Sequence, residues 1–242
     1  MASKVMIISG AGLSAESGIS TFRDSDGLWE NYDVMEVCST QGWENDREKV
    51  TNFYNARRKD LKDKEPNEAH LTLATLEKKY PNHIMHLTQN VDNLLERAGC
   101  EEIIHLHGTL TDLRCEACAH VWDIGYAAQN EHDACPRCES EAVRHNVVMF
   151  GESAPAYSRI YEAIAQCGLF VAIGTSGQVI DVVTIAREFD HSVFINPKRE
   201  EYVTAFGSFE QYIDTFFERF IQKKASEAAD DMAGIITRFL ER

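Results

Sequence analysis

The 242-residue sequence predicts an α/β fold: a Rossmann-like parallel sheet with helices on both faces, plus a small inserted zinc-ribbon module. Short apolar runs of strand length alternate with longer segments whose apolar residues recur every three or four positions, a pattern typical of strand–helix repeats. Glycine or small polar residues directly follow three of the strand-length runs, at 10–12, 89–92 and 174–176. Two C-x-x-C pairs between 115 and 138 interrupt the repeats and indicate the inserted module.

The chain carries a formal net charge of −15, from 24 Lys and Arg against 39 Asp and Glu. This charge opposes nonspecific binding to nucleic acids and anionic membranes, whose phosphates would be repelled. An acidic surface suits lysine-bearing protein substrates, although acidity is also common among soluble proteins. No apolar run approaches the roughly 18 residues of a membrane span. We therefore expect a cytoplasmic protein with no direct nucleic-acid or membrane partner.

The first predicted strand, 4–9, ends in Gly10-Ala11-Gly12. A glycine turn between a buried strand and a helix can cradle a phosphate, because the backbone approaches closely and free N–H groups face the anion. An ordinary glycine turn is the alternative. A usual dinucleotide fold would place an acidic residue on a second strand about 20 positions later. Residues 21–29 are instead polar and predict a loop.

Residues 46–64 predict a charged helix whose apolar stripe contains Arg57. An arginine in such a stripe needs an anion or a route to water, because an unpaired buried guanidinium costs several kcal/mol. Arg57 could also lie at the edge of the stripe or pair with Glu65. Tyr54 lies almost one helical turn earlier, so the two side chains point the same way and can share one carboxylate.

The strand predicted at 84–88 delivers Gln89, Asn90 and Asp92 at its carboxyl end. Ligands of open α/β sheets bind at this end of the strands, so these polar residues are candidates for a binding site. Asp92 could also cap the helix predicted at 93–98, and the two roles are compatible.

The strand predicted at 102–108 places His105 and His107 on the same face. A histidine at a strand end is more often structural than catalytic. His107, however, precedes a glycine at which the chain can turn into a cleft. His107 is therefore the candidate site residue of the two, and we interpret His105 as a core or supporting residue.

The four clustered cysteines are Cys115, Cys118, Cys135 and Cys138. Two C-x-x-C pairs at this separation are typical of a zinc ribbon, because each pair offers two thiolates and the four complete a closed tetrahedron. Such a site has no open coordination position, so a structural zinc is predicted. A nucleic-acid-binding ribbon is the rival interpretation, which the scarcity of basic residues nearby disfavours.

The second half of the chain continues the alternation of strands and helices. Its predicted elements are a segment at 147–152 that re-enters the main sheet, a helix at 157–167, a strand at 169–173 that ends in Gly174-Thr175-Ser176, a helix that begins at 179–182, a strand at 192–197 that ends near Asn196, an apolar helix over 209–220 and a final helix over 229–239.

The order of these motifs resembles that of the sirtuins, which are NAD-dependent protein deacylases. The resemblance covers 4–196 and rests on the string from Gly10 to Arg23, the Thr-Gln-Asn-Val-Asp motif, the Leu-His-Gly motif, the cysteines and 147–152. The Tyr54 and Arg57 pair is similar to the Tyr-x-x-Arg of class III sirtuins, whose acyl pocket prefers succinyl- and malonyl-lysine. Three positions depart from the usual family residues: Ser20, His145 and Ile180-Asp181.

The resemblance implies NAD-dependent removal of succinyl, malonyl and acetyl groups from lysine, with nicotinamide and O-acyl-ADP-ribose as products. The acyl oxygen attacks the nicotinamide ribose, and His107 then removes a proton from a ribose hydroxyl. NAD is the implied co-substrate, together with one structural zinc. The implied site residues are Gly10, Ala11, Gly12, Ser14, Phe22, Arg23, Gln89, Asn90, Asp92, Gly174, Thr175, Ser176 and Asn196 for NAD, Tyr54 and Arg57 for the acyl group, and Val148, Phe150 and Gly151 for the substrate peptide.

The predicted NAD-binding domain comprises 1–110 and 146–242, and the zinc module comprises 111–145. Acyl-lysine-bearing proteins or peptides are the expected partners. Three alternatives stay open from the sequence: a plain deacetylase with a structural Arg57, a protein mono-ADP-ribosyltransferase, and an NAD-responsive binding module. The set of His107, Asn90 and Asp92 argues against the last, because a pure binder needs no base.

Overall fold

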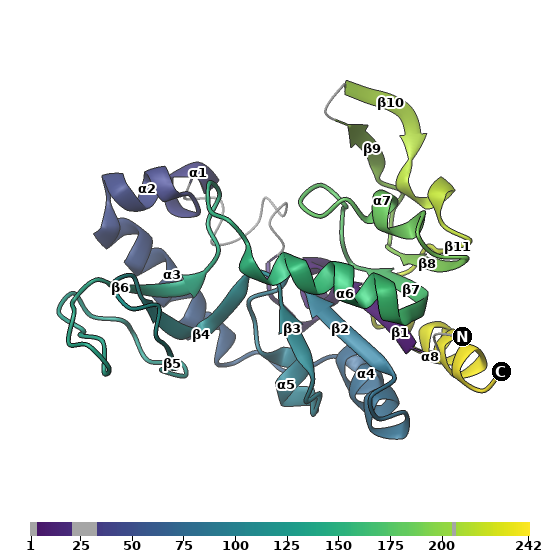
Figure 1. Ribbon diagram of the computed structural model, residues 1–242, viewed down its shortest axis with the longest axis horizontal. Coiled ribbons are helices and arrows are strands. Elements are labelled where there is room, and N and C mark those ends of the chain that lie inside the picture. Colours follow the sequence, from purple (N-terminus) through teal and green to yellow (C-terminus); the bar gives the residue numbers. More distant parts are fainter. Residues whose placement is uncertain (1–3, 21–32, 205–206) are drawn as a thin grey trace.

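The computed structural model describes residues 4–20, 33–204 and 207–242. Its main sheet has the strand order β11-β8-β7-β1-β2-β3, and every neighbouring pair in it is parallel (Figure 1). The strands are β1 (Lys4–Ser9), β2 (Ile84–Thr88), β3 (Ile103–His105), β7 (Cys167–Ile173), β8 (His191–Ile195) and β11 (Arg219–Ile221). The predicted parallel sheet is confirmed.

The strand order reverses between β1 and β7. From β1 the chain builds outward through β2 and β3, then returns to the other side of β1 and builds outward through β7, β8 and β11. Counted along the chain, these strands follow the doubly wound order 3-2-1-4-5-6, in which ligands bind outside the carboxyl ends of the strands at the point of reversal. The turns after Ser9 and Ile173, which are paired in register, therefore face the expected ligand position.

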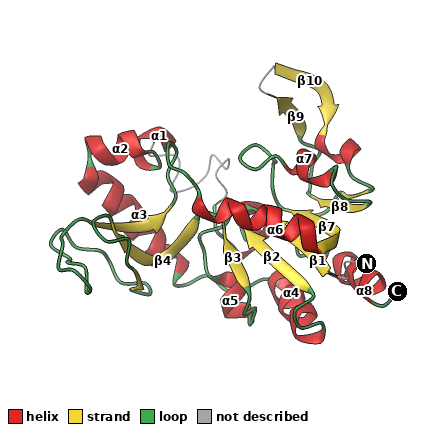
Figure 2. Ribbon diagram, in the orientation of Figure 1, coloured by secondary structure: helices red, strands yellow, loops and turns green. Residues whose placement is uncertain are grey.

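Helices cover both faces of this sheet (Figure 2). Val5 and Ile7 of β1 pack in one apolar cluster with helices α4 (Glu68–Lys79), α5 (Leu94–Ala98) and α8 (Ala229–Leu240). Met6 and Ile8 pack in the opposite cluster with α6 (Ser158–Gln166) and α7 (Val182–Ala186). All four β1 side chains are fully buried, which explains why this strand is apolar throughout rather than alternating.

A second region is built on a three-stranded antiparallel sheet with the order β5-β4-β6. Its strands are β4 (Gly108–Cys115), β5 (Val121–Asp123) and β6 (Val143–Val147), and it packs with the helices α1 (Val34–Val37), α2 (Thr40–Asn45) and α3 (Arg47–Leu61). The predicted module boundaries at 111 and 145 fall inside β4 and β6, so that division stays a prediction. This region lies to the left of the main sheet in Figure 1.

Three sequence-based expectations about local structure are wrong. The turn after β1 leads into two 3₁₀ turns, Ala11–Leu13 and Ala15–Ser17, rather than an α-helix. The segment after β6 does not re-enter the main sheet, and Phe150 instead forms an isolated parallel bridge with Ser39.

The third concerns 209–220, which is not helical. It contains the end of β10 (Gly207–Tyr212), which pairs with β9 (Glu201–Thr204), then the 3₁₀ turn Ile213–Phe216 and β11. Phe217 and Phe220 both pack on Phe194 of β8, with ring centroids 5.2 and 5.7 Å away. Their three-residue spacing reflects a tight turn into an edge strand rather than a helix face. None of the described helices is long and apolar enough to cross a membrane.

Candidate functional site

A cavity of about 1010 Å³ opens at the reversal point of the main sheet and extends toward α3 and β6. Every predicted nucleotide, acyl and peptide residue within the described part of the chain lines it. Phe22 and Arg23 lie outside the described residues. We name the two ends of the cavity after the sequence predictions: the nucleotide end is formed by the turns after β1, β2, β7 and β8, and the acyl end is formed by Cys38, Tyr54 and Arg57.

The glycine turns after β1 and β7 lie against each other. The Gly10 and Gly12 N–H groups donate to the carbonyls of Ile173 and Gly174, at 3.0 and 2.8 Å. A Cβ on Gly12 would lie 2.7 Å from the Gly174 Cα, and Gly174 itself has a φ of +62°. Glycine is required at these positions because the turns after β1 and β7 pack closely together, whether or not a ligand also contacts them.

Ser14 is the centre of a buried hydrogen-bond network. Its hydroxyl donates to Asp92 Oδ2 at 2.9 Å and accepts from Asn90 Nδ2 at 3.1 Å. His70 Nδ1 accepts the Asn67 N–H, which leaves Nε2 protonated to donate to Ser14 at 3.3 Å. Burial lowers the pKa of His70 to about 4, so the imidazole is neutral. The network thereby joins the turns after β1 and β2 to helix α4 at the nucleotide end of the cavity.

Asp92 has both of the predicted environments. Oδ1 accepts the Leu94 N–H at 3.1 Å at the start of α5, while Oδ2 accepts the Ser14 hydroxyl. Burial raises the pKa of Asp92, and the hydrogen bonds from Leu94 and Ser14 oppose that shift. The carboxylate is therefore both a helix-end acceptor and part of the cavity wall.

The remaining polar turns connect neighbouring strands. Gln89 Nε2 donates to Thr175 Oγ1 at 3.0 Å, so the turns after β2 and β7 are joined across β1. Asn196 lies after β8, and its Nδ2 donates to the Lys198 carbonyl at 3.0 Å. Gln89, Thr175 and Asn196 all lie at the carboxyl ends of strands of the main sheet, the edge at which the sequence predicts a binding site.

His107 is held by two hydrogen bonds. Nδ1 lies 2.9 Å from the Gln89 carbonyl, and Nε2 lies 2.8 Å from the Tyr157 hydroxyl. Burial lowers the pKa of His107, and the hydrogen bond to the Gln89 carbonyl opposes that shift. A neutral imidazole whose Nε2 faces the cavity has the form that a general base needs.

His105 has a different environment: it is the last residue of β3, which ends before His107, so the predicted strand over 102–108 is shorter than expected and His107 lies in the turn between β3 and β4. It contacts the Asn90 carbonyl through Nδ1 at 3.0 Å and Glu96 through Nε2 at 2.6 Å. Burial lowers its pKa, but the hydrogen bond and charge of Glu96 outweigh burial and raise it overall. His105 therefore supports the start of α5 and does not line the cavity.

The acyl end is built around Tyr54. Its hydroxyl donates to Cys38 Sγ at 3.5 Å, and its ring stacks on His145 with centroids 3.7 Å apart. Trp43 contacts the other side of the His145 ring edge-on, at 5.7 Å. His145 stands where the resembling family usually has proline, and here it belongs to β6 and backs the tyrosine. Arg57 follows Tyr54 on α3 and lines the same end.

The segment 148–151 forms one rim of the cavity. The Val148 N–H donates to the His107 carbonyl at 2.9 Å, and the Phe150 N–H donates to the Cys38 carbonyl at 2.8 Å. The Phe150 carbonyl accepts from Thr40 at 3.0 Å, while the Phe150 side chain is 41% exposed. The rim is thus anchored to both ends of the site and presents an aromatic side chain outward.

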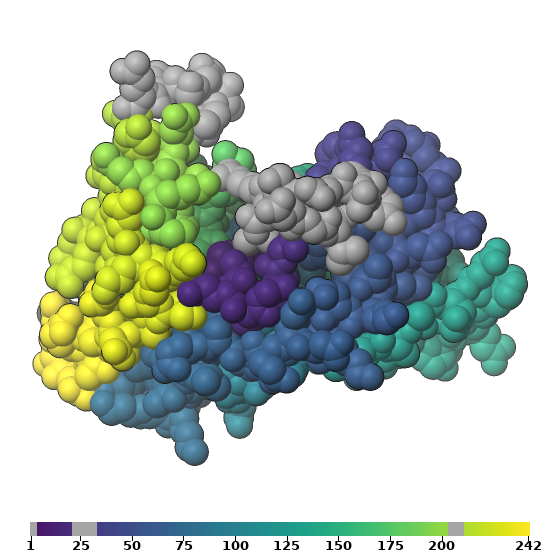
Figure 3. Space-filling view, turned by 180° about the vertical axis from the view of Figure 1, so that it is seen from behind, coloured from purple at the N-terminus to yellow at the C-terminus, as the bar shows by residue number. Residues whose placement is uncertain are grey.

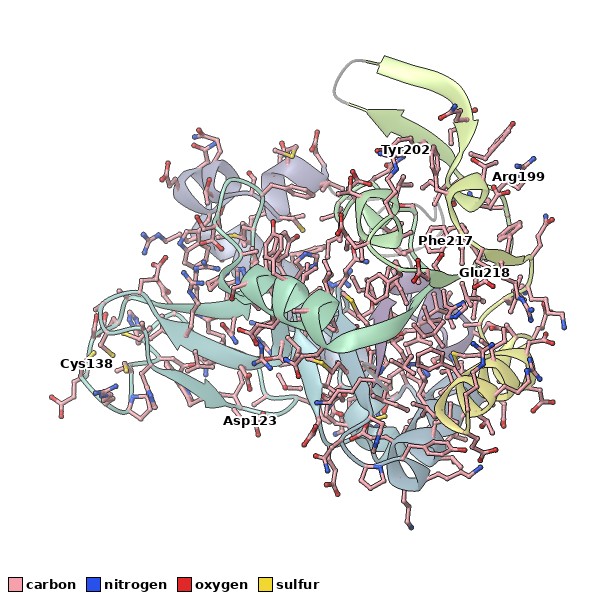
Figure 4. The ribbon with its side chains drawn as sticks, turned by 45° about the vertical axis from the view of Figure 1, so that its right-hand side comes forward. Asp123, Cys138, Arg199, Tyr202, Phe217 and Glu218 are labelled. Atoms are coloured by element: carbon pink, nitrogen blue, oxygen red, sulfur yellow. The ribbon has the colours of Figure 1, made fainter. Side chains whose placement is uncertain are left out.

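The four predicted metal ligands converge. Their sulfur atoms all lie within 4.8 Å of one another, with Cys115 and Cys138 3.6 Å apart and Cys118 and Cys135 3.7 Å apart. Zinc–thiolate bonds of about 2.3 Å in a tetrahedron place the sulfurs about 3.8 Å apart, so the cluster fits zinc. Cys138 lies at the end of the module remote from the main sheet (Figure 4).

Each cysteine pair sits on a similar turn. The N–H groups of Ala119 and Glu139 donate to the carbonyls of Cys115 and Cys135, at 3.0 and 2.9 Å, and both donors have positive φ angles of 58° and 62°. Two such knuckles are the arrangement that C-x-x-C pairs predict.

Residues 10–181 match the Sir2 family, which is more than half of the chain. The chain belongs to the Sir2 family. It is 51% identical over 189 residues to an NAD-dependent protein deacylase of Campylobacter jejuni, an alignment that covers 78% of this chain and 81% of that protein. It is 39% identical over 231 residues to one of Escherichia coli strain K12, covering 90% and 82%.

Solved Sir2 structures share the whole architecture. A complex of a Sir2 homologue with NAD has a TM-score of 0.80 at 31% identity, and covers 98% of this chain and 90% of that chain. An ADP-ribose complex of a Sir2 homologue variant has a TM-score of 0.82 at 30% identity, covering 98% and 93%. The Rossmann-like fold with an inserted cysteine module is therefore confirmed.

Three residues of this Sir2-family site were not identified from the sequence: Cys38, His70 and Tyr157. Cys38 precedes Tyr54 by 16 positions and Tyr157 follows His107 by 50, so no local pattern links them to the site. His70 had a local signal, because Asn67 and His70 are spaced as a capping box. The departure at Ile180-Asp181 also has a local reason: Asp181 accepts the Val183 N–H and caps α7.

Proposed function

We propose that this Sir2-family NAD-dependent protein-lysine deacylase removes succinyl and malonyl groups in addition to acetyl groups. The reaction releases nicotinamide and transfers the acyl group to ADP-ribose. The observation that carries the acyl preference is the position of Tyr54 and Arg57 together at one end of the cavity. The named relatives are deacylases, a word that leaves the acyl group open.

Two consecutive arginines of α3 have contrasting environments. Arg58 is fully buried and donates to the Leu110 carbonyl at 2.7 Å and to Asn55 Oδ1 at 2.9 Å, which fastens α3 to β4. Arg57 lines the cavity, with its guanidinium 5.6 Å from the centre of the Phe53 ring. Fixing Arg58 orients the helix so that Arg57 is presented to the cavity. Its position in the cavity lining supports a ligand-binding role for Arg57 rather than a structural one.

The electrostatics favour an anionic acyl group. Burial lowers the pKa of Arg57, and the nearby Tyr54 and Cys38 oppose that shift; a guanidinium nonetheless stays charged near neutral pH. Hydrogen bonds to charged groups contribute about 1.5–3 kcal/mol, or roughly 10- to 150-fold in affinity. Glu65, the alternative partner for Arg57, pairs with Arg97 at 2.9 Å.

Tyr54 can join the same carboxylate. Its hydroxyl donates to the sulfur of Cys38, which is a weak acceptor, so turning toward a carboxylate oxygen sacrifices little. Burial raises the pKa of Tyr54 well above its usual range, so the hydroxyl keeps its proton and remains a donor. Tyr54 and Arg57 then form a carboxylate clamp.

The proposed chemistry places NAD at the nucleotide end, where it supplies the ribose that accepts the acyl group. Gly10, Gly12 and Ser176 would face the phosphates and Asn196 the adenosine. Asn90 and Asp92 would hold the nicotinamide, and Gln89 would orient the ribose. His107 Nε2 takes the proton from a ribose hydroxyl. Nδ1 carries the imidazole proton because it donates to the Gln89 carbonyl, and this leaves Nε2 unprotonated.

The substrate peptide is proposed to lie along Val148, Phe150 and Gly151. The backbone N–H groups of Val148 and Phe150 are engaged within the chain, which stiffens the rim. The exposed Phe150 side chain is then the part of the rim that contacts the residues flanking the acyl-lysine.

The test is kcat/KM, at saturating NAD, on one peptide carrying either succinyl-lysine or acetyl-lysine. The wild type is expected to prefer succinyl-lysine. Arg57→Met is expected to lower succinyl turnover about 10- to 100-fold, because the charge-assisted bonds are lost, and to change acetyl turnover less than about threefold.

Lys59→Met is the matched control, because Lys59 is an exposed cation on the same helix. It should leave the ratio of the two acyl substrates unchanged. A wild type that prefers acetyl-lysine, together with an Arg57→Met variant that alters both substrates equally, would make this a plain deacetylase with a structural arginine.

A further inference from the structure

Tyr157, which belongs to none of the sequence motifs described above, contacts the proposed base His107. It ends the 3₁₀ turn Pro155–Tyr157 directly before α6, and its hydroxyl lies 2.8 Å from His107 Nε2. Its ring packs against the apolar cluster beneath α6 and is tilted by 48° to the imidazole, with centroids 5.8 Å apart. Tyr157 and His107 line the same cavity.

The proton positions follow from the partners. A carbonyl oxygen only accepts, so the contact of His107 Nδ1 with the Gln89 carbonyl places the imidazole proton on Nδ1. Nε2 of the neutral ring then carries a lone pair, and the Tyr157 hydroxyl donates to it. Burial raises the pKa of Tyr157, so the hydroxyl stays protonated near neutral pH.

The lone pair that must receive the ribose proton is therefore already engaged. One lone pair does not accept two well-aligned hydrogen bonds, so a ribose hydroxyl and the Tyr157 hydroxyl compete for Nε2. We propose that Tyr157 is a positioning residue that holds His107 Nε2 in the nucleotide-free enzyme and is displaced by the ribose hydroxyl when NAD binds. The inference rests on the proposed role of His107 as the base.

The arrangement has two consequences. Hydrogen bonds at both ring nitrogens fix the imidazole before the ligand arrives, so less rotational freedom is lost when it binds. A donor on Nε2 also stabilises the neutral ring and so lowers the pKa of the free enzyme's base. Within the described residues, Arg57, Asp60 and Glu152 are charged side chains that line the acyl side of the cavity, and Asp92 lines the nucleotide end; the pKa of His107 is set by burial and by the Gln89 carbonyl.

The test compares Tyr157→Phe, which removes only the hydroxyl, with Tyr161→Phe. Tyr161 is four residues further along, on α6, and its side chain is 75% exposed, so it serves as the matched control. ADP-ribose and NAD affinities are measured by calorimetry, and kcat and kcat/KM for NAD are measured against pH.

Tyr157→Phe is expected to bind NAD about two- to tenfold more tightly, because no hydrogen bond has to be displaced. The acid limb of kcat/KM, which reports the free enzyme, is expected to move to higher pH. The pH profile of kcat, which reports the complex in which Tyr157 has left Nε2, is expected to stay unchanged. Tyr161→Phe should match the wild type in every measurement.

Two results would overturn the proposal. Unchanged affinity and unchanged pH profiles would reduce Tyr157 to a packing role. A loss of kcat of about 100-fold or more with a shifted kcat profile would place its hydroxyl in the proton path rather than outside it.

A second variant of Tyr157 keeps both the hydroxyl group and the size of the ring. Incorporating 3-fluorotyrosine at 157 makes the phenol a stronger donor and is expected to move the acid limb of kcat/KM the opposite way, to lower pH; no movement contradicts the proposal. Failure of the proposed function has a separate signature: the wild type would lack deacylase activity, whereas the ADP-ribose affinities of the two variants remain measurable.

Discussion

The two ends of the cavity are constructed differently. The nucleotide end consists of backbone turns and short polar side chains at the carboxyl ends of β1, β2, β7 and β8, joined by hydrogen bonds such as Gly12 to Gly174. The acyl end consists of large side chains from α2, α3 and β6: Tyr54 stacks on His145, and Trp43 contacts His145 edge-on. The first end is defined by topology, and the second is defined by packing.

The second region also depends on the cysteine module. Arg144 of β6 is fully buried and forms ion pairs with Glu116, within the first C-x-x-C pair, and with Glu152, directly after the cavity rim. The nucleotide end instead contacts the C-terminal part of the chain: the Ser226 N–H donates to Glu16 at 2.8 Å. Figure 3 shows the N-terminal segment in purple beside that yellow segment. The two ends should therefore respond to different perturbations.

The largest effect is expected at His107, where the ends meet. His107→Ala should lower kcat/KM about 10²- to 10⁴-fold, the usual contribution of a general base. NAD affinity should persist, because the nucleotide turns do not depend on this side chain. Steady-state kinetics and calorimetry check both expectations, with His105→Gln, at the end of β3 and outside the cavity lining, as the control. An active His107→Ala enzyme would remove the base from this assignment.

Zinc removal should separate the two ends. Structural zinc sites contribute folding free energy directly, so chelation or Cys115→Ser should unfold the β4–β6 sheet. Through Arg144 and Glu152 the acyl end should then lose its peptide substrate, with kcat/KM falling about tenfold or more. ADP-ribose affinity should fall less, because its turns belong to the main sheet. A chelated enzyme that stays folded and fully stable contradicts this expectation.

The free energy of unfolding should fall at acid pH, because His70, which is hydrogen-bonded to Ser14 at the nucleotide end, is buried in its neutral form. Burial lowers the pKa of His70 to about 4, so between its unfolded value near 6.5 and pH 4 the unfolded state binds a proton that the native state does not. This contribution is complete above pH 6.5 and is lost as the pH falls through that window, a total of about 3 kcal/mol. His86, whose pKa burial lowers to about 3, acts in the same direction.

Urea unfolding at pH 7 and pH 4.5 measures this loss. His70→Gln should flatten the pH dependence, whereas a substitution of the exposed His132 to Gln should leave it as in the wild type. A wild-type free energy of unfolding that stays constant over this range would show that His70 is not a buried neutral group.

The sequence predicted which residues come together at the nucleotide end because each of its parts is local. Gly10, Gln89 and Gly174 each follow directly on an apolar run, and parallel strands bring their carboxyl ends to one edge. The four cysteines likewise form two local pairs. Tyr54 and Arg57 were identifiable only because they share one helix face.

Residues brought in from distant elements had no comparable signal. The contact of Tyr157 with His107 exists because α6 crosses the sheet beside β3, which no spacing reveals. The segment 209–220 shows the opposite error: its apolar spacing was typical of a helix, but part of it forms the edge strand β11, and Phe217 and Phe220 pack on Phe194 of β8. Tertiary packing overrode the local pattern there.

The smallest effect is expected at Gly12. Its lack of a side chain allows the turns after β1 and β7 to pack together and would also allow a phosphate to approach the backbone. A methyl group would lie 2.7 Å from the Gly174 Cα, so Gly12→Ala should separate the turns after β1 and β7 and lower the free energy of unfolding by about 1–3 kcal/mol. Gly99→Ala is the control, because Gly99 has a φ of +104° but nothing within 4 Å of an added Cβ, so it carries backbone strain alone. Denaturant unfolding and NAD calorimetry measure both variants. If Gly12→Ala keeps full stability and loses only NAD affinity, the glycine serves the ligand alone; if both fall together, the nucleotide end is a loop-to-loop contact first and a phosphate cradle second.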